Sequence, residues 1–65
     1  MSNLQQAIRV LVVDDSVDAA NGLAAVLSSA DYEARAAYDG SSALKVATSF
    51  RPHLVLLDIE MPGMD

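Results

Sequence analysis

Two short apolar runs, each ended by aspartate, place the strongest constraint on how this chain can fold. Residues 8–13 read IRVLVV and are followed by Asp14 and Asp15, and residues 54–57 read LVLL and are followed by Asp58. Neither run shows the apolar–polar alternation of a strand with one wet face, which is typical of strands covered on both faces of a parallel sheet. The pattern therefore predicts two buried parallel strands with acids at their carboxyl ends.

The sequence between these runs predicts two helices and one further strand. A first apolar stripe at helical spacing predicts a helix from Val17 to about Ser29, capped by Asp15 or Ser16. Residues 32–37 (YEARAA) alternate in polarity and predict a half-exposed edge strand. After an Asp39–Gly40 turn, a second apolar stripe predicts a helix that ends before Pro52. The first stripe comprises Val17, Ala20, Leu23, Ala24 and Leu27, and the second comprises Ala43, Leu44, Ala47 and Phe50.

The order strand, helix, strand, helix, strand predicts an α/β fold with right-handed crossovers and a parallel sheet. The two apolar strands should be neighbours and the polar strand should lie outside the first, which gives the strand order 2-1-3. A topological switch point then falls between the first and third strands, where ligands of open α/β sheets bind. Asp14, Asp15 and Asp58 are all expected at that edge.

Composition excludes several classes of function. A chain of 65 residues and 6.9 kDa forms one small domain at most, and a chain with no cysteine and one histidine is a poor zinc ligand. The net charge is −5, and the four basic residues are dispersed along the sequence, so no direct contact with nucleic acid is expected. No signal peptide or membrane-spanning run is recognisable, and the absence of cysteine fits a cytoplasmic location.

The three acids at one edge predict a metal-assisted phosphoryl site. Taken singly, Asp14, Asp15 and Asp58 could be a loop acid, a helix cap and a strand-end polar residue. Together, three neighbouring carboxylates repel one another unless a cation neutralises them, and an oxygen-only ligand set favours Mg²⁺. A carboxylate can also attack phosphorus to form an aspartyl phosphate. Asp58 stands alone on its strand and is the natural acceptor, whereas the Asp14–Asp15 pair can hold the ion.

These residues also carry a family resemblance. The segments VLVVDDS (10–16), YDGSSAL (38–44) and PHLVLLDIEMPGMD (52–65) resemble the receiver domain of bacterial two-component response regulators across nearly the whole chain. The resemblance implies that Asp58 is the phospho-acceptor, that Asp15 binds Mg²⁺ directly and Asp14 largely through water, and that Glu60 offers its main-chain carbonyl to the metal. It implies a histidine kinase or phosphotransfer protein as partner, and a signalling role rather than an enzymatic one.

The chain also departs from that family. A receiver domain has about twice this length and five strands, so residues 1–65 are expected to be a truncated receiver domain that ends in the loop after the third strand. The Ser/Thr and Lys that the family places after strands four and five are absent, and Lys45 does not replace that lysine. The LVLL strand then becomes an exposed apolar edge, which predicts self-association of two copies through it.

Two other classes of function remain open at this point. A haloacid-dehalogenase-like phosphohydrolase also uses an aspartyl nucleophile after a strand, and Asp58-Ile59-Glu60 imitates its Asp-x-Asp motif. An inert structural or dimerising fragment, unreactive toward phosphate, is the other alternative. A dinucleotide-binding fold is disfavoured because no G-x-G-x-x-G motif follows the first strand.

Overall fold

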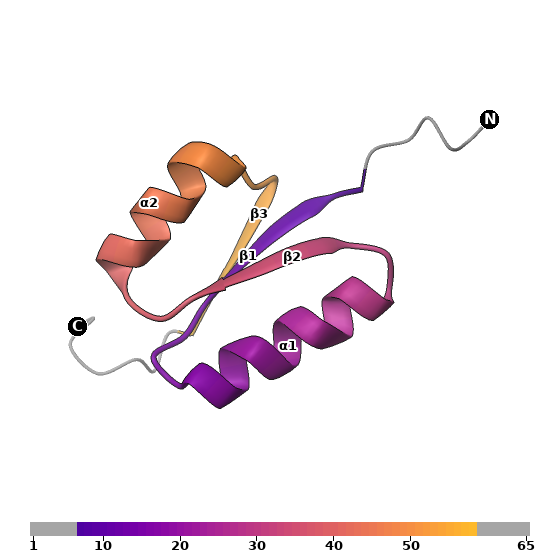
Figure 1. Cartoon of the computed structure of the whole chain (residues 1–65), viewed down its shortest axis with the longest axis horizontal. Coiled ribbons are helices and arrows are strands. Elements are labelled where there is room, and N and C mark those ends of the chain that lie inside the picture. Colours follow the sequence, from indigo (N-terminus) through magenta and orange to yellow (C-terminus); the bar gives the residue numbers. More distant parts are fainter. Residues whose placement is uncertain (1–6, 59–65) are drawn as a thin grey trace.

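The computed structural model describes residues 7–58, and these form three strands and two helices in the predicted order. The elements are β1 (Arg9–Val13), α1 (Val17–Ser29), β2 (Glu33–Ala37), α2 (Gly40–Phe50) and β3 (Leu54–Leu57). All pairings are parallel and the strand order is β2-β1-β3, so the predicted 2-1-3 sheet is confirmed. The two helices lie on opposite faces of the sheet (Figure 1).

β1 supplies the centre of the core because it is covered on both faces. Val10 and Val12 face α1 and pack with Ala20, whereas Leu11 and Val13 face α2 and pack with Ala37. All four β1 residues from Val10 to Val13 are at most 3% exposed. The absence of polar alternation in this strand thus has a direct structural reason: a helix lies against each face.

The ends of the helices are set by local side-chain bonds. Ser16 caps α1, since its Oγ accepts the Ala19 N–H at 3.3 Å, and this decides between the two predicted caps. Asp39 caps α2, since its carboxylate accepts the Ser42 N–H at 2.7 Å; the predicted Asp39–Gly40 turn is therefore the first step of the helix. α2 ends at Phe50, and the next residue, Arg51, has a left-handed backbone (φ 56°, ψ 64°) that turns the chain before Pro52.

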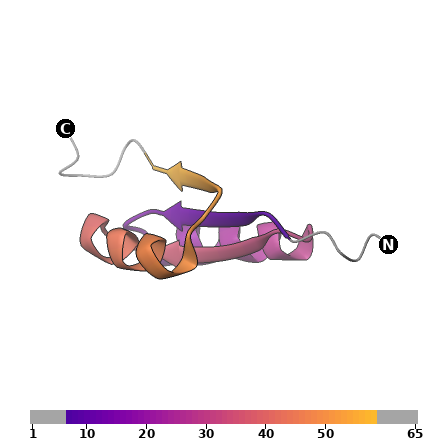
Figure 2. The same cartoon turned by 90° about the horizontal axis from the view of Figure 1, so that it is seen from above.

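β3 is the least covered element of the sheet. Neither helix lies directly over it within the described part of the chain, and Figure 2 shows it at the sheet edge; only Leu56 packs against the cluster of Val10, Val12 and Ala20. Leu54, Val55 and Leu57 are each about half exposed (50%, 49% and 47%). The fully apolar sequence of this strand therefore does not reflect burial by residues 7–58, unlike that of β1.

His53 has a local structural role at the entrance of β3. Its Nδ1 accepts the backbone N–H of Arg9 at 2.9 Å, and its own N–H donates to the Arg9 carbonyl at 2.8 Å. These two bonds join the first residues of β1 and β3. His53 is exposed and lies at the opposite end of β3 from Asp58.

Candidate metal and phosphoryl site

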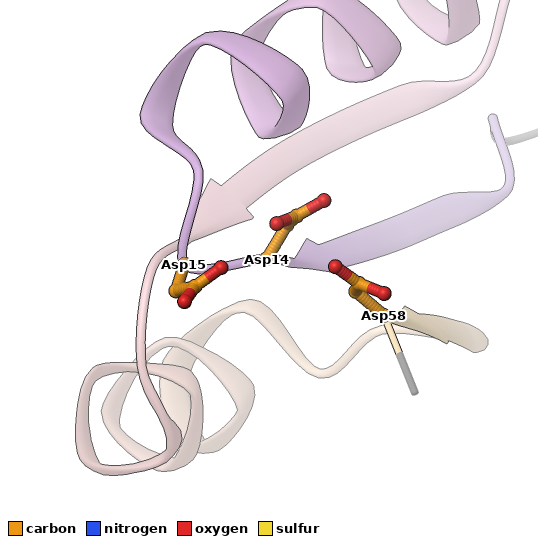
Figure 3. A group of neighbouring side chains, drawn as sticks. All are labelled: Asp14, Asp15 and Asp58. Atoms are coloured by element: carbon orange, nitrogen blue, oxygen red, sulfur yellow. The ribbon is translucent and has the colours of Figure 1, made fainter. Parts of the chain in front are cut away.

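The carboxyl ends of β1 and β3 bring three aspartates together. Asp14 and Asp15 directly follow β1, and Asp58 directly follows β3, whose last residue Leu57 pairs with Val13. One carboxylate oxygen from each of the three aspartates lies within 4.8 Å of the other two. Figure 3 shows the three side chains gathered at this edge, and the parallel topology alone accounts for their meeting.

Backbone hydrogen bonds hold two of these aspartates in place. The Asp14 N–H donates to the Ala37 carbonyl at 3.1 Å, and the Asp58 N–H donates to the Val13 carbonyl at 3.1 Å. Each acid is thereby fixed to the end of a neighbouring strand. Asp14 and Asp58 are half-buried, whereas Asp15 is exposed.

One carboxylate oxygen of Asp14 already accepts a backbone hydrogen bond. Its Oδ1 accepts the Ser16 N–H at 2.9 Å, which leaves Oδ2 for another partner. Because Ser16 caps α1, the side chain of Asp15 is not needed at the helix end. One oxygen of Asp14 is therefore occupied by a backbone hydrogen bond, whereas the Asp15 carboxylate is not used to cap the helix. This difference follows from the order Asp-Asp-Ser in the sequence.

The three acids fit a hard divalent cation. Their oxygens are the only metal-ligating set that residues 7–58 bring together, and carboxylate oxygen is the donor that Mg²⁺ favours. Without a cation, three carboxylates at this separation repel one another. Glu60, whose main-chain carbonyl was expected to complete the set, lies outside the described residues.

A small apolar groove adjoins the acids. A hollow of about 220 Å³ runs between α1 and β3 and carries Asp14 and Asp58 at one end, with Leu23, Leu56 and Leu57 among its other lining residues. The site is therefore open to solvent on one side and bordered by aliphatic side chains on the other.

Sequence reasoning missed a polar link between α1 and the segment that follows β2. The Tyr38 hydroxyl donates to the Asn21 side-chain oxygen at 2.6 Å, which ties the segment after β2 to the second turn of α1. Nothing in the sequence indicates this bond, because it joins side chains 17 positions apart and depends on how α1 packs against the sheet.

A family model described as the response regulator receiver domain matches residues 10–65 of this chain. Among similar proteins, a protein-glutamate methylesterase/protein-glutamine glutaminase of Rhodopseudomonas palustris is 46% identical over 59 residues, which cover 89% of this chain and 16% of that protein. The transcriptional regulatory protein PrrA of Mycobacterium tuberculosis is 46% identical over 57 residues (88% and 24%), and the response regulator PleD of Caulobacter vibrioides is also 46% identical over 57 residues (88% and 13%).

The fold and the acidic edge thus define a parallel α/β module of the doubly wound type with its ligand edge at the switch point. The chain belongs to the response regulator receiver family, as its resemblance implied. Receiver domains of this family are signalling modules of two-component systems, generally without catalytic activity of their own. The chain spans between about one eighth and one quarter of the length of the relatives named above.

Proposed function

We propose that this chain accepts a phosphoryl group on Asp58, with Mg²⁺ held by Asp14, Asp15 and Asp58. The observation that supports this most directly is the meeting of the three carboxylates within 4.8 Å at the carboxyl edge of a receiver-family sheet. Glu60 remains the proposed donor of a main-chain carbonyl. On this proposal residues 1–65 are part of one receiver domain.

The proposed transfer is a simple exchange of bonds at phosphorus. A carboxylate oxygen of Asp58 attacks the phosphorus of a phosphohistidine on a kinase or phosphotransfer protein, and an O–P bond forms as the N–P bond breaks. The imidazole nitrogen leaves with the electron pair. The ion, when bound, neutralises charge that builds on the phosphoryl oxygens. Asp14 is held by Ala37 and Ser16, so it keeps its position while Asp58 reacts.

The test is the intact mass of the chain after incubation with acetyl phosphate and Mg²⁺. One phosphoryl adduct is expected in the parent chain, and none without Mg²⁺ or in Asp58→Asn. Asp31→Asn is the matched control, because it removes a carboxylate outside the cluster from a left-handed position (φ 74°) that asparagine tolerates. An adduct that persists in Asp58→Asn would place the acceptor elsewhere. No adduct on a folded chain that binds Mg²⁺ would favour the inert alternative.

Repeated phosphate release separates the enzyme alternative from this proposal. A phosphohydrolase would release many equivalents of phosphate from small phosphoesters per chain, whereas an acceptor stops after one.

Within residues 7–58, neither helix is long and apolar enough to cross a bilayer. A cytoplasmic location and the absence of nucleic-acid contacts stay predictions.

We also propose that two copies of the chain pair through β3. Its outer edge carries apolar side chains on both faces and no charge, so a second β3 meets it without like-charge repulsion. An antiparallel pair about a twofold axis would place Val55 or Leu56 opposite its own copy.

Sedimentation at increasing concentration tests this pairing. Val55→Lys on β3 should leave the chain monomeric, whereas Val26→Lys, on the exposed face of α1 (63% exposed), should not. A parent chain that stays monomeric at every concentration, or equal effects of the two lysines, would contradict pairing through β3.

A further inference from the structure

Three of the four basic residues of this acidic chain border one hollow at the amino ends of the strands. The hollow has a volume of about 600 Å³ and is called the arginine hollow below; it is lined by Arg9, Glu33, Arg35, Ser49, Phe50 and Arg51. These arginines are dispersed in sequence, yet the fold gathers them. The fourth basic residue, Lys45, lies within α2 and does not line the hollow.

The arginine hollow exists because α2 stops before it covers its whole face of the sheet. Leu11 packs against α2, and its partner in the register is Arg35. Arg9 and its partner Glu33 lie two positions earlier in each strand and so belong to the same face. Since α2 ends at Phe50, these first residues of β1 and β2 lie beyond its last turn.

Two of the guanidinium groups are held by specific contacts. Arg9 Nε donates to the Arg51 carbonyl at 2.9 Å, and the Arg35 guanidinium carbon lies 4.7 Å from the centroid of the Phe50 ring. None of the three arginines forms an ion pair with a carboxylate of residues 7–58. Their remaining N–H donors are therefore available to an anion, and the side chains of Arg9 and Arg35 are already restricted in position.

We propose that the arginine hollow binds a small phosphate-containing anion with at least two negative charges. Guanidinium groups present paired N–H donors that match the oxygens of phosphate. Three arginines and one glutamate give the hollow a net charge of +2, while the whole chain carries −5. A long polyanion such as nucleic acid would meet the acidic remainder of the surface, whereas a small anion meets only the hollow. The site is independent of the proposed acceptor site.

The experiment is a titration with pyrophosphate at low ionic strength, with EDTA present, followed by nitrogen–proton NMR. The arginine Nε–H signals of Arg9, Arg35 and Arg51 should shift and saturate. Charged hydrogen bonds contribute about 1.5–3 kcal/mol each, so Arg35→Gln should weaken binding roughly tenfold or more. Lys45→Gln, which changes the net charge equally, should leave the affinity within about twofold.

Arg51→Gln keeps the proposal testable if Arg35→Gln disturbs the contact with Phe50. Among residues 7–58 the Arg51 side chain forms no hydrogen bond or ion pair, and the Arg51 carbonyl remains for Arg9. It too should weaken pyrophosphate binding. The proposal is overturned if no signal saturates, or if Lys45→Gln weakens binding as much as Arg35→Gln, which would assign the effect to net charge. An octaglutamate peptide that binds more tightly than pyrophosphate would overturn the phosphate assignment in favour of a carboxylate-rich partner.

Discussion

Replacing Arg51 with glycine should stabilise this chain, because Arg51 ends α2 in a left-handed conformation (φ 56°, ψ 64°). A side chain with a Cβ makes this conformation unfavourable by about 1–2 kcal/mol. Glycine removes that cost but loses more backbone entropy on folding, by roughly 0.5–1 kcal/mol. The bond from the Arg51 N–H to the Ala47 carbonyl (2.9 Å) and the bond from Arg9 to the Arg51 carbonyl involve only backbone atoms of residue 51, so both persist.

The net expectation for Arg51→Gly is a gain of about 0.5–1 kcal/mol in the free energy of unfolding, or roughly 2–8 °C in Tm for a chain of this size. Thermal denaturation followed by circular dichroism measures it. Lys45→Gly is the matched control, because it also exchanges a basic residue of the α2 segment for glycine, but inside the helix, where glycine costs about 1 kcal/mol. The reasoning fails if both variants lower Tm, since the left-handed conformation would then contribute no strain.

Two further predictions concern the core and the helix cap. Leu11→Ala should lower the free energy of unfolding by about 2–5 kcal/mol, because Leu11 is 1% exposed. Leu44→Ala should change it by less than about 0.5 kcal/mol, because Leu44 is 72% exposed. Equal losses in a urea titration of the two variants would refute this ranking. The hydrogen bond from the Ser42 N–H lowers the pKa of Asp39 below its ordinary value of 3.8, so this bond stabilises the fold above that pH and its contribution is lost as pH falls through the lowered pKa. Asp39→Asn keeps a capping oxygen without titrating, so it should lose less stability on acidification below pH 3.8 than the parent chain, and an unchanged acid profile would contradict the assignment.

Topology explains why the acidic site could be predicted from the sequence. The spacing of apolar residues indicates each element, and parallel strands with helical crossovers necessarily bring their carboxyl ends to one edge. Asp14, Asp15 and Asp58 meet there whatever the details of packing. The choice of Ser16 over Asp15 as helix cap was not predictable, because either side chain can accept from the first turn.

The arginine hollow could not be predicted in this way. Arg9 and Arg51 are 42 positions apart, and their contact depends on where α2 ends relative to the first residues of β1. The position of Arg35 depends on the register that pairs it with Leu11, and the sequence of a single strand does not specify this register. Basic residues that are far apart in the sequence can therefore lie close together in a parallel sheet, because the amino ends of the strands meet at one edge just as their carboxyl ends do.

The two charged ends of the sheet should act independently under physiological conditions. β1 has five residues, so the acidic cluster after Val13 and the arginine hollow at Arg9 are separated by roughly 16 Å at about 3.3 Å per residue. This is about twice the distance of about 8 Å over which charges are screened at 0.15 M salt. Any influence of Mg²⁺ on anion binding must be reciprocal, since coupling between two sites is a single free energy. Because pyrophosphate also binds Mg²⁺ in solution, affinities are compared at the free concentration of each ion. If coupling is electrostatic, pyrophosphate and Mg²⁺ should then affect each other's affinity only at low salt; coupling that persists at 0.15 M would require β1 or its helices to change arrangement.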